Sequence, residues 1–67
     1  MSNDEKLDNI ARKIRAGMAM KKWKKADLAI QSNMSLSQII RRLQFPGVIK
    51  LEELVVFEDV LDIKLLD

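Results

Sequence analysis

The sequence predicts an all-α fold, a compact bundle of four to five helices that forms a single domain over residues 1–67. Apolar residues recur at steps of three and four along successive stretches, which places them on one face of a helix. Ser2 and Ser35 are each followed three residues later by Glu or Gln, a signature of a helix start. The stretch EELVVFEDVL lacks the alternation of a half-buried strand, so it is also predicted as helix.

The first helix is expected at about residues 3–19. Ser2 and Glu5 form its capping box, and Gly17 weakens it near its end. Trp23 follows this helix and is interpreted as a core residue, with stacking on a nucleic-acid base as the alternative. The apolar face of the first helix is expected to consist of Leu7, Ile10, Ala11, Ile14 and Met18.

Two short helices separated by a sharp turn are expected next, at about 25–32 and 35–44, with Leu28 and Ala29 facing inward. Asn33 suits the left-handed backbone that ends a helix, and Ser35 with Gln38 makes a second capping box. Helical spacing divides the second of these helices into two faces. The apolar face holds Leu36, Ile39, Ile40 and Leu43, and the polar face holds Ser37, Gln38, Arg41, Arg42 and Gln44.

The last third of the chain is expected to contain one more helix. Pro46 and Gly47 stop the preceding helix and make a loop, after which a fourth helix is expected at about 50–61. The residues at 63–66 are mostly apolar and are expected to form one short turn. The apolar residues of the fourth helix are Leu51, Leu54, Val55, Val60 and Leu61.

The composition argues against several classes of function. With no His and no Cys, a transition-metal site would consist of carboxylates alone, so neither a metal nor a cofactor is expected. No paired catalytic arrangement stands out among the Asp, Glu, Lys and Ser residues, so neither enzymatic activity nor a small-molecule substrate is expected. The apolar runs are too short for a membrane span and the N-terminus is unlike a signal peptide, which favours the cytoplasm.

The charges are unevenly distributed along the chain. Residues 1–45 hold ten Lys or Arg against four acids, a net charge of +6, whereas residues 46–67 hold two Lys against six acids, a net charge of −4. The N-terminal part is therefore suited to an anionic partner such as nucleic acid, and the C-terminal part is not.

A short helix, a turn of about three residues and a second amphipathic helix form a helix-turn-helix pattern, in which the second helix can lie in the DNA major groove. Ala29, Asn33 and Ile39 occupy the places of the small residue, the turn residue and the aliphatic anchor of the phage repressor and Cro family. The chain resembles this lambda-repressor-like family over about residues 7–66, because its C-terminal stretch is also similar to the family's closing helix.

The resemblance implies a DNA-binding face at the start and outer side of the third helix, made of Ser35, Ser37, Gln38 and Arg41, with Arg42 beside them. Gln can bind adenine through two hydrogen bonds, Arg can do the same with guanine, and Ser can bind bases or phosphates. Lys25 would bind a phosphate at the start of the second helix. Lys21, Lys22 and Lys24 would add attraction that does not depend on base sequence and weakens with salt.

Three apolar residues depart from the family pattern. Ile30, Leu36 and Ile40 stand where the family commonly has polar, charged or small side chains, and together they are candidates for an exposed apolar patch. Such a patch usually contacts a protein partner. The alternative interpretation is that Leu36 and Ile40 only widen the buried stripe of the third helix.

Two functions follow from these expectations. The first is a phage-type transcriptional regulator that binds double-stranded operator DNA in a bacterial or phage-infected cell, as a possible homodimer. The candidates for its dimer seam are Val60, Leu61, Ile63, Leu65 and Leu66. The second is an antirepressor or modulator that grips the DNA-binding domain of a phage repressor, with Ile30, Leu36 and Ile40 as anchors and Arg41, Arg42 and the lysines as the charged rim.

Overall fold

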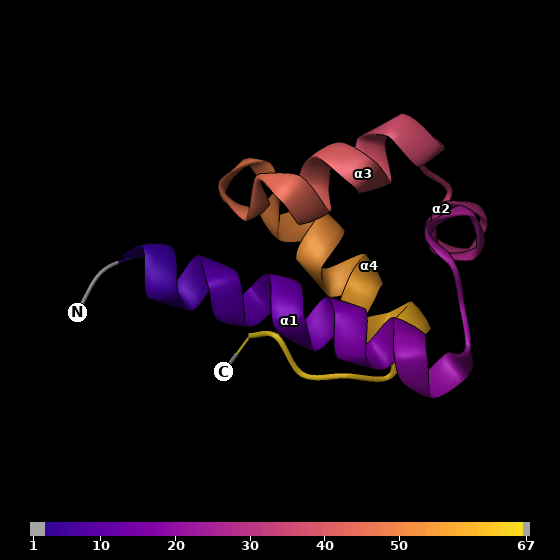
Figure 1. Ribbon diagram of the computed structural model, residues 1–67, viewed down its shortest axis with the longest axis horizontal. Coiled ribbons are helices and arrows are strands. Elements are labelled where there is room, and N and C mark those ends of the chain that lie inside the picture. Colours follow the sequence, from indigo (N-terminus) through magenta and orange to yellow (C-terminus); the bar gives the residue numbers. More distant parts are fainter. Residues whose placement is uncertain (1–2, 67) are drawn as a thin grey trace.

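The computed structural model describes residues 3–66 and confirms the all-α prediction. Four α-helices, α1 (Asn3–Lys21), α2 (Lys25–Ser32), α3 (Leu36–Gln44) and α4 (Leu51–Leu61), are joined by short connections, and these residues form no strand. A 3-10 turn, η1 (Pro46–Val48), lies where Pro46 and Gly47 predicted only a loop. In Figure 1 the long helix α1 crosses the molecule, α3 runs above it, α4 is drawn between the two, and α2 is seen end-on at the right.

Three helices begin with the same kind of hydrogen bond. The side chain at the third helical position accepts the backbone N–H of the residue that precedes the helix, at 2.8 Å in α2, 2.9 Å in α3 and 2.9 Å in α4. In α3 the bond is reciprocated, because the Ser35 hydroxyl accepts the backbone N–H of Gln38 at 3.1 Å, as the sequence predicted. The other predicted capping box depends on Ser2, which lies outside the described residues. The accepting residues are Asp27, Gln38 and Glu53.

Three helices also end in the same way, with one residue in the left-handed conformation. Asn33 has φ 56° and ψ 43°, which confirms its predicted role in the turn. The N–H of Met34 then reaches back to the carbonyl of Ala29 at 2.9 Å, which satisfies a carbonyl at the end of α2. Lys22 and Asp62 take the same conformation after α1 and α4; Asp is one of the residue types that tolerate it, whereas Lys is not.

The core lies where one face of each helix meets the others. Its most deeply buried side chains come one from each helix: Ile14, Leu28, Ile39 and Phe57. Trp23 is half-buried and packs against this core, as its interpretation as a core residue predicted. The ammonium nitrogen of Lys21 lies 5.4 Å from the centre of the Trp23 ring. No helix within residues 3–66 combines the length and the apolar character that crossing a bilayer requires.

The segment after α4 corrects two predictions. Residues 63–66 form no helical turn. In Figure 1 they run below α1 as an irregular segment without secondary structure. Glu58 holds them in place, because its Oε2 accepts the backbone N–H of Leu65 at 2.6 Å and of Leu66 at 2.7 Å. These bonds lower the pKa of Glu58. A short turn cannot form while the carboxylate of Glu58 binds these two N–H groups.

Two of the five candidates for the dimer seam at the C-terminus are also contradicted. Leu61 and Leu65 are buried in the core of their own chain, and Val60 and Ile63 pack against it. Gly17 allows this close packing, since a Cβ there would lie 3.1 Å from the Ile63 Cγ2 atom. Leu61 and Leu65 therefore complete the core of a small domain and are not available to a second copy, whereas the remaining candidate, Leu66, is half-buried.

Candidate functional site

The candidate site is the outer surface of α2 and α3. Three residues, 33–35, separate the two helices, and the Asn33 backbone turns the chain between them. Leu28 and Ala29 face the core from α2, while Ile39 and Leu43 do so from α3. Burial of these four side chains fixes which side of each helix is turned outward.

The outer face of α3 is part apolar and part polar. Leu36 is 46% exposed and Ile40 is 42% exposed, so the interpretation that they widen the buried stripe is wrong. They lie one helical turn apart, and Ser37, Arg41 and Gln44 form the neighbouring exposed row. Apolar and hydrogen-bonding side chains therefore stand side by side on the surface that was predicted to bind a partner.

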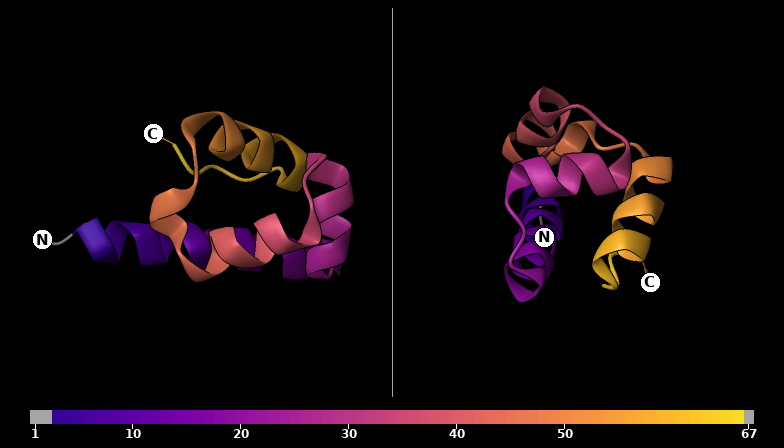
Figure 2. Two further views of the ribbon diagram at one scale, coloured as in Figure 1. Left: turned by 90° about the horizontal axis from the view of Figure 1, so that it is seen from above. Right: turned by 90° about the vertical axis from the view of Figure 1, so that its right-hand side faces the viewer.

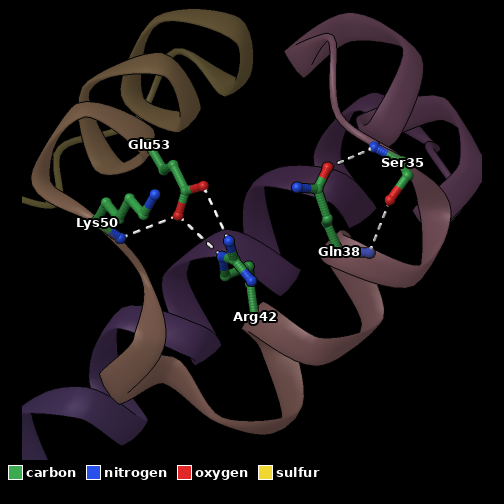
Figure 3. Close-up of polar contacts among 5 residues, drawn as sticks. All are labelled: Ser35, Gln38, Arg42, Lys50 and Glu53. Carbon is green, nitrogen blue, oxygen red and sulfur yellow. Dashed lines mark hydrogen bonds and ion pairs between the residues drawn. The ribbon is translucent and has the colours of Figure 1, made fainter.

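Ser35 and Gln38 are exposed but already engaged with each other. Figure 3 shows the two reciprocal hydrogen bonds of the cap, in which Gln38 Oε1 accepts the Ser35 N–H at 2.9 Å. The cap fixes the orientation of the Gln38 amide and leaves its NH₂ group free to donate. Gln38 can therefore donate one hydrogen bond to a ligand without disturbing the start of α3, whereas a paired contact to adenine competes with the cap.

Arg42 does not lie on the outer face, and its predicted place there beside Arg41 is wrong. Its Nε donates to Glu53 Oε1 at 2.9 Å and its Nη2 donates to Glu53 Oε2 at 3.2 Å (Figure 3). The side chains of Arg42 and Glu53 are only 12% and 14% exposed. The hydrogen bonds from Arg42 lower the pKa of Glu53 and raise that of Arg42.

A signal for this placement exists in the sequence. Arg42 stands three residues after Ile39, on the edge of the buried stripe, whereas Arg41 stands four residues after Ser37, in the exposed row. The acceptor, Glu53, lies 11 residues further on in another helix, and local spacing does not reveal that the two meet. The ion pair joins α3 to the first turn of α4, so Arg42 serves to position α3.

The four lysines lie together where α1 ends and α2 begins. All four are exposed, and Figure 1 places this junction beside the N-terminal end of α2. Lys25 is the first residue of α2, where the helix dipole also favours an anion. Positive charge therefore adjoins the outer surface of α2 and α3, and it is supplied by Lys21, Lys22, Lys24 and Lys25.

The third apolar candidate, Ile30, is 75% exposed on α2. Sequence reasoning missed a second group of exposed apolar residues, because the spacing of the fourth helix suggested that Leu51 and Val55 face inward. This group lies on η1, α4 and the residue before them, and it is called here the α4 patch: Phe45, Val48, Leu51, Val55 and Val56.

Two further features of residues 3–66 were considered as binding sites, an open hollow and the acidic side chains. An open hollow of about 380 Å³ lies between α1 and the end of α3, where Arg15 donates to the Leu43 carbonyl at 3.2 Å. Within residues 3–66 no three His, Cys, Asp or Glu side chains come together in a way that would hold a metal ion.

No family model matches the chain, and no match was found among curated proteins or solved structures.

Proposed function

We propose that the protein is a helix-turn-helix regulator of the phage repressor and Cro kind, which binds operator DNA through the outer face of α3 in the cytoplasm of a bacterial or phage-infected cell. The observation that carries the proposal is the left-handed turn at Asn33. The helix before this turn, α2, packs on the core, and the helix after it, α3, has a row of polar side chains exposed to solvent. This row consists of Ser37, Arg41 and Gln44.

Four of the exposed side chains of α3 can bind groups that the major groove of DNA presents. Arg41 can donate two hydrogen bonds to guanine, and Ser37 can bind a base or a phosphate. Leu36 and Ile40 can contact the methyl group of thymine, which is the apolar feature that this groove presents. The proposal therefore accounts for a mixed face, provided that the operator places thymines beside guanines.

The lysines supply the part of the affinity that does not depend on base sequence. If the four lysines at the α1–α2 junction each neutralise a phosphate, the logarithm of the binding constant falls with that of salt concentration with a slope of about −4. Arg42 contributes nothing to this slope in the proposal, because Glu53 already neutralises it.

The first experiment measures binding of the whole chain to duplex DNA by fluorescence anisotropy over a series of salt concentrations. Arg41→Ala is expected to weaken specific binding by about 1–3 kcal/mol. Lys13→Ala removes the same charge from an exposed site on α1 beside the C-terminal segment, so it is the matched control. Equal losses for the two variants would mean that α3 does not read the bases.

A second function is favoured by a different observation. Ile30, Leu36 and Ile40 are exposed on adjoining helices, and a cluster of exposed apolar side chains is typical of a protein-binding surface. We propose as the alternative that the protein is an antirepressor or modulator that binds the DNA-binding domain of a phage repressor. Arg41 and the four lysines would then form the charged rim around three apolar anchors.

Leu36→Asp separates the two functions. It places a carboxylate on the outer face, and since Leu36 is already half-exposed the core is expected to remain intact. No affinity for DNA at low salt, together with loss of a repressor complex on Leu36→Asp, would establish the second function and exclude the first. DNA binding that Arg41→Ala weakens, with no repressor complex, would establish the first.

A further inference from the structure

Neither proposed function uses the α4 patch, which consists of Phe45, Val48, Leu51, Val55 and Val56. Leu51 is 66% exposed and Val55 is 51% exposed, and they lie one helical turn apart. Val56 adjoins Val55 on the same exposed arc of α4. Apolar side chains that gather on a surface in this way indicate that a partner covers it.

Two acidic residues, Glu52 and Asp59, lie on the same exposed arc of α4. They are seven residues apart in the sequence, so they stand on one face of the helix, two turns and about 10 Å from each other. Val55 and Val56 lie between them, each one turn away from both acids. The arc therefore presents an apolar centre with a carboxylate on either side.

The surroundings of this arc are negatively charged. Neither of the two carboxylates has an ion-pair partner in the described part of the chain, where the one ion pair joins Arg42 to Glu53. Asp62, which directly follows α4, is also exposed, and Lys50 is the exposed base at the start of the helix. Residues 46–67 as a whole carry a net charge of −4.

This charge distinguishes between classes of partner. It repels nucleic acid, an anionic membrane and a second copy of the same face, and it attracts a surface that carries Lys or Arg. Residues 3–66 form no strand, so they offer no sheet edge to which an extended peptide could add. The class of partner that satisfies both conditions is an amphipathic helix with basic residues beside its apolar stripe.

We propose that the α4 patch binds a basic amphipathic helix of another protein. The apolar stripe of that helix covers Leu51, Val55 and Val56, and its basic side chains pair with Glu52 and Asp59. Two Lys or Arg residues that are seven apart on a helix match the spacing of the two acids, provided that this helix crosses α4 at the shallow angle of about 20° that is common between packed helices.

The interaction goes beyond both proposed functions, because it takes place on a different part of the molecule. In both views of Figure 2, α4 lies at one side of the molecule, opposite α1 and apart from α3. A helix bound to α4 therefore leaves the outer surface of α2 and α3 free. The protein could then hold DNA or a repressor through α3 and a second, basic protein through α4 at the same time.

The test measures binding of the full chain to a labelled synthetic peptide by fluorescence anisotropy. The peptide is a helix with leucines along one face and two lysines seven residues apart beside them, and a scrambled peptide of the same composition is its control. Val55→Gln is expected to raise the dissociation constant at least about fivefold, because it removes the apolar centre. Met20→Gln is the matched control, since Met20 is an exposed apolar residue on α1.

Charge reversal tests the role of the two acids. Glu52→Lys combined with Asp59→Lys is expected to raise the dissociation constant at least about tenfold, and a peptide with glutamates in place of its two lysines is expected to bind this variant more tightly than the unmodified chain. The two changes lie in the first and last turns of α4, so their effects on the helix dipole oppose each other and folding is expected to survive, as circular dichroism would show. Asp8→Lys reverses an exposed acid on α1 and is the matched control for each single change.

Four results would overturn the proposal. The first is equal binding of the designed and scrambled peptides, or no binding of either, and the second is an equal loss of binding for Asp59→Lys and Asp8→Lys. The third is loss of peptide binding in Leu36→Asp but not in Val55→Gln, which would place the peptide on α3. The fourth is binding of the chain to uncharged phosphatidylcholine vesicles that Val55→Gln abolishes, which would make the patch a membrane surface. Failure of the chain to bind DNA or a repressor tests the proposed functions alone, because the peptide experiment contains neither.

Discussion

The ion pair between Arg42 and Glu53 allows the most detailed prediction, because its two side chains join α3 to α4. Glu53→Gln keeps the shape of the side chain and one oxygen that can accept the Lys50 N–H, which now lies at 2.9 Å from Glu53 Oε1. It removes the negative charge and one of the two hydrogen bonds from Arg42. The guanidinium then remains 12% exposed without a counter-charge.

The expected loss follows from that burial. Removing one partner of a fully buried ion pair costs about 3–5 kcal/mol, whereas exposed pairs contribute about 0–1 kcal/mol. With side chains 12% and 14% exposed and the cap retained, Glu53→Gln is expected to destabilise the fold by about 2 kcal/mol. For a domain of this size the melting temperature would fall by roughly 8–16 °C.

Urea unfolding measures the free energy, with helical circular dichroism and Trp23 fluorescence as independent probes of unfolding. Arg42→Met combined with Glu53→Gln is expected to cost less than the sum of the single changes, because neither charge is then left unpaired. A loss below about 0.5 kcal/mol for Glu53→Gln, or strict additivity, would refute the reasoning.

The same pair contributes to the dependence of stability on pH. The pKa of Glu53 is lowered in the folded state, so its contribution is fully present above the unfolded pKa, near 4.5, and is lost as the pH falls through the folded pKa. The pKa of Glu58 is also lowered, so both carboxylates act in the same direction. In the Glu53→Gln variant the free energy of unfolding is expected to fall less as the pH is lowered, and the remaining decrease is expected to come from Glu58.

Three further substitutions test the packing and the caps, each by urea unfolding. Ser32→Ala is expected to stabilise the fold by about 1 kcal/mol, because the buried Ser32 hydroxyl has no hydrogen-bond partner; a destabilised variant would contradict this. Lys22→Gly is expected to raise the free energy of unfolding by about 0.5–1 kcal/mol, because Lys22 has φ 59° and Gly adopts a positive φ without steric cost. Gly17→Ala gains about 1 kcal/mol in helix propensity but places a Cβ 3.1 Å from Ile63 and 3.3 Å from Leu61, so a net loss of about 1 kcal/mol is expected. A stabilised Gly17→Ala variant would contradict this, because it would show that the residues after α4 move to make room for the added Cβ without loss of packing energy.

The sequence predicts the helices well because their signals are local. Helical spacing and the reciprocal cap of Ser35 and Gln38 act within one turn of the chain, and Asn33 ends α2 through its own backbone preference. The predicted bounds of α2 match the structure, and those of α1, α3 and α4 differ by one or two residues. Such agreement is expected wherever propensity, capping and apolar spacing point to the same element.

The sequence predicts less well where the deciding contact is distant. Apolar spacing identifies a stripe but not its width, so it leaves open whether Leu36 and Ile40 are buried or exposed, and it places Leu51 among the inward-facing residues although the side chain is 66% exposed. The tail after α4 has no periodic pattern, and its conformation depends on a carboxylate seven and eight residues earlier. Arg42 likewise depends on an acceptor 11 residues away.

These distant contacts determine which parts of α3 can bind a partner. Arg42 and Arg41 are adjacent in sequence, yet Glu53 binds the first to α4 and leaves the second in solvent. We infer that the ion pair, together with the buried side chains of Ile39 and Leu43, holds the rotation of α3 about its own axis and so the side on which Arg41 stands. It follows that Glu53→Gln, which touches no residue of the outer face, is expected to weaken binding of either proposed partner beyond its effect on the folded fraction. Binding measured well below the unfolding transition, where nearly all molecules are folded, tests this: an unchanged affinity would mean that the core alone orients α3.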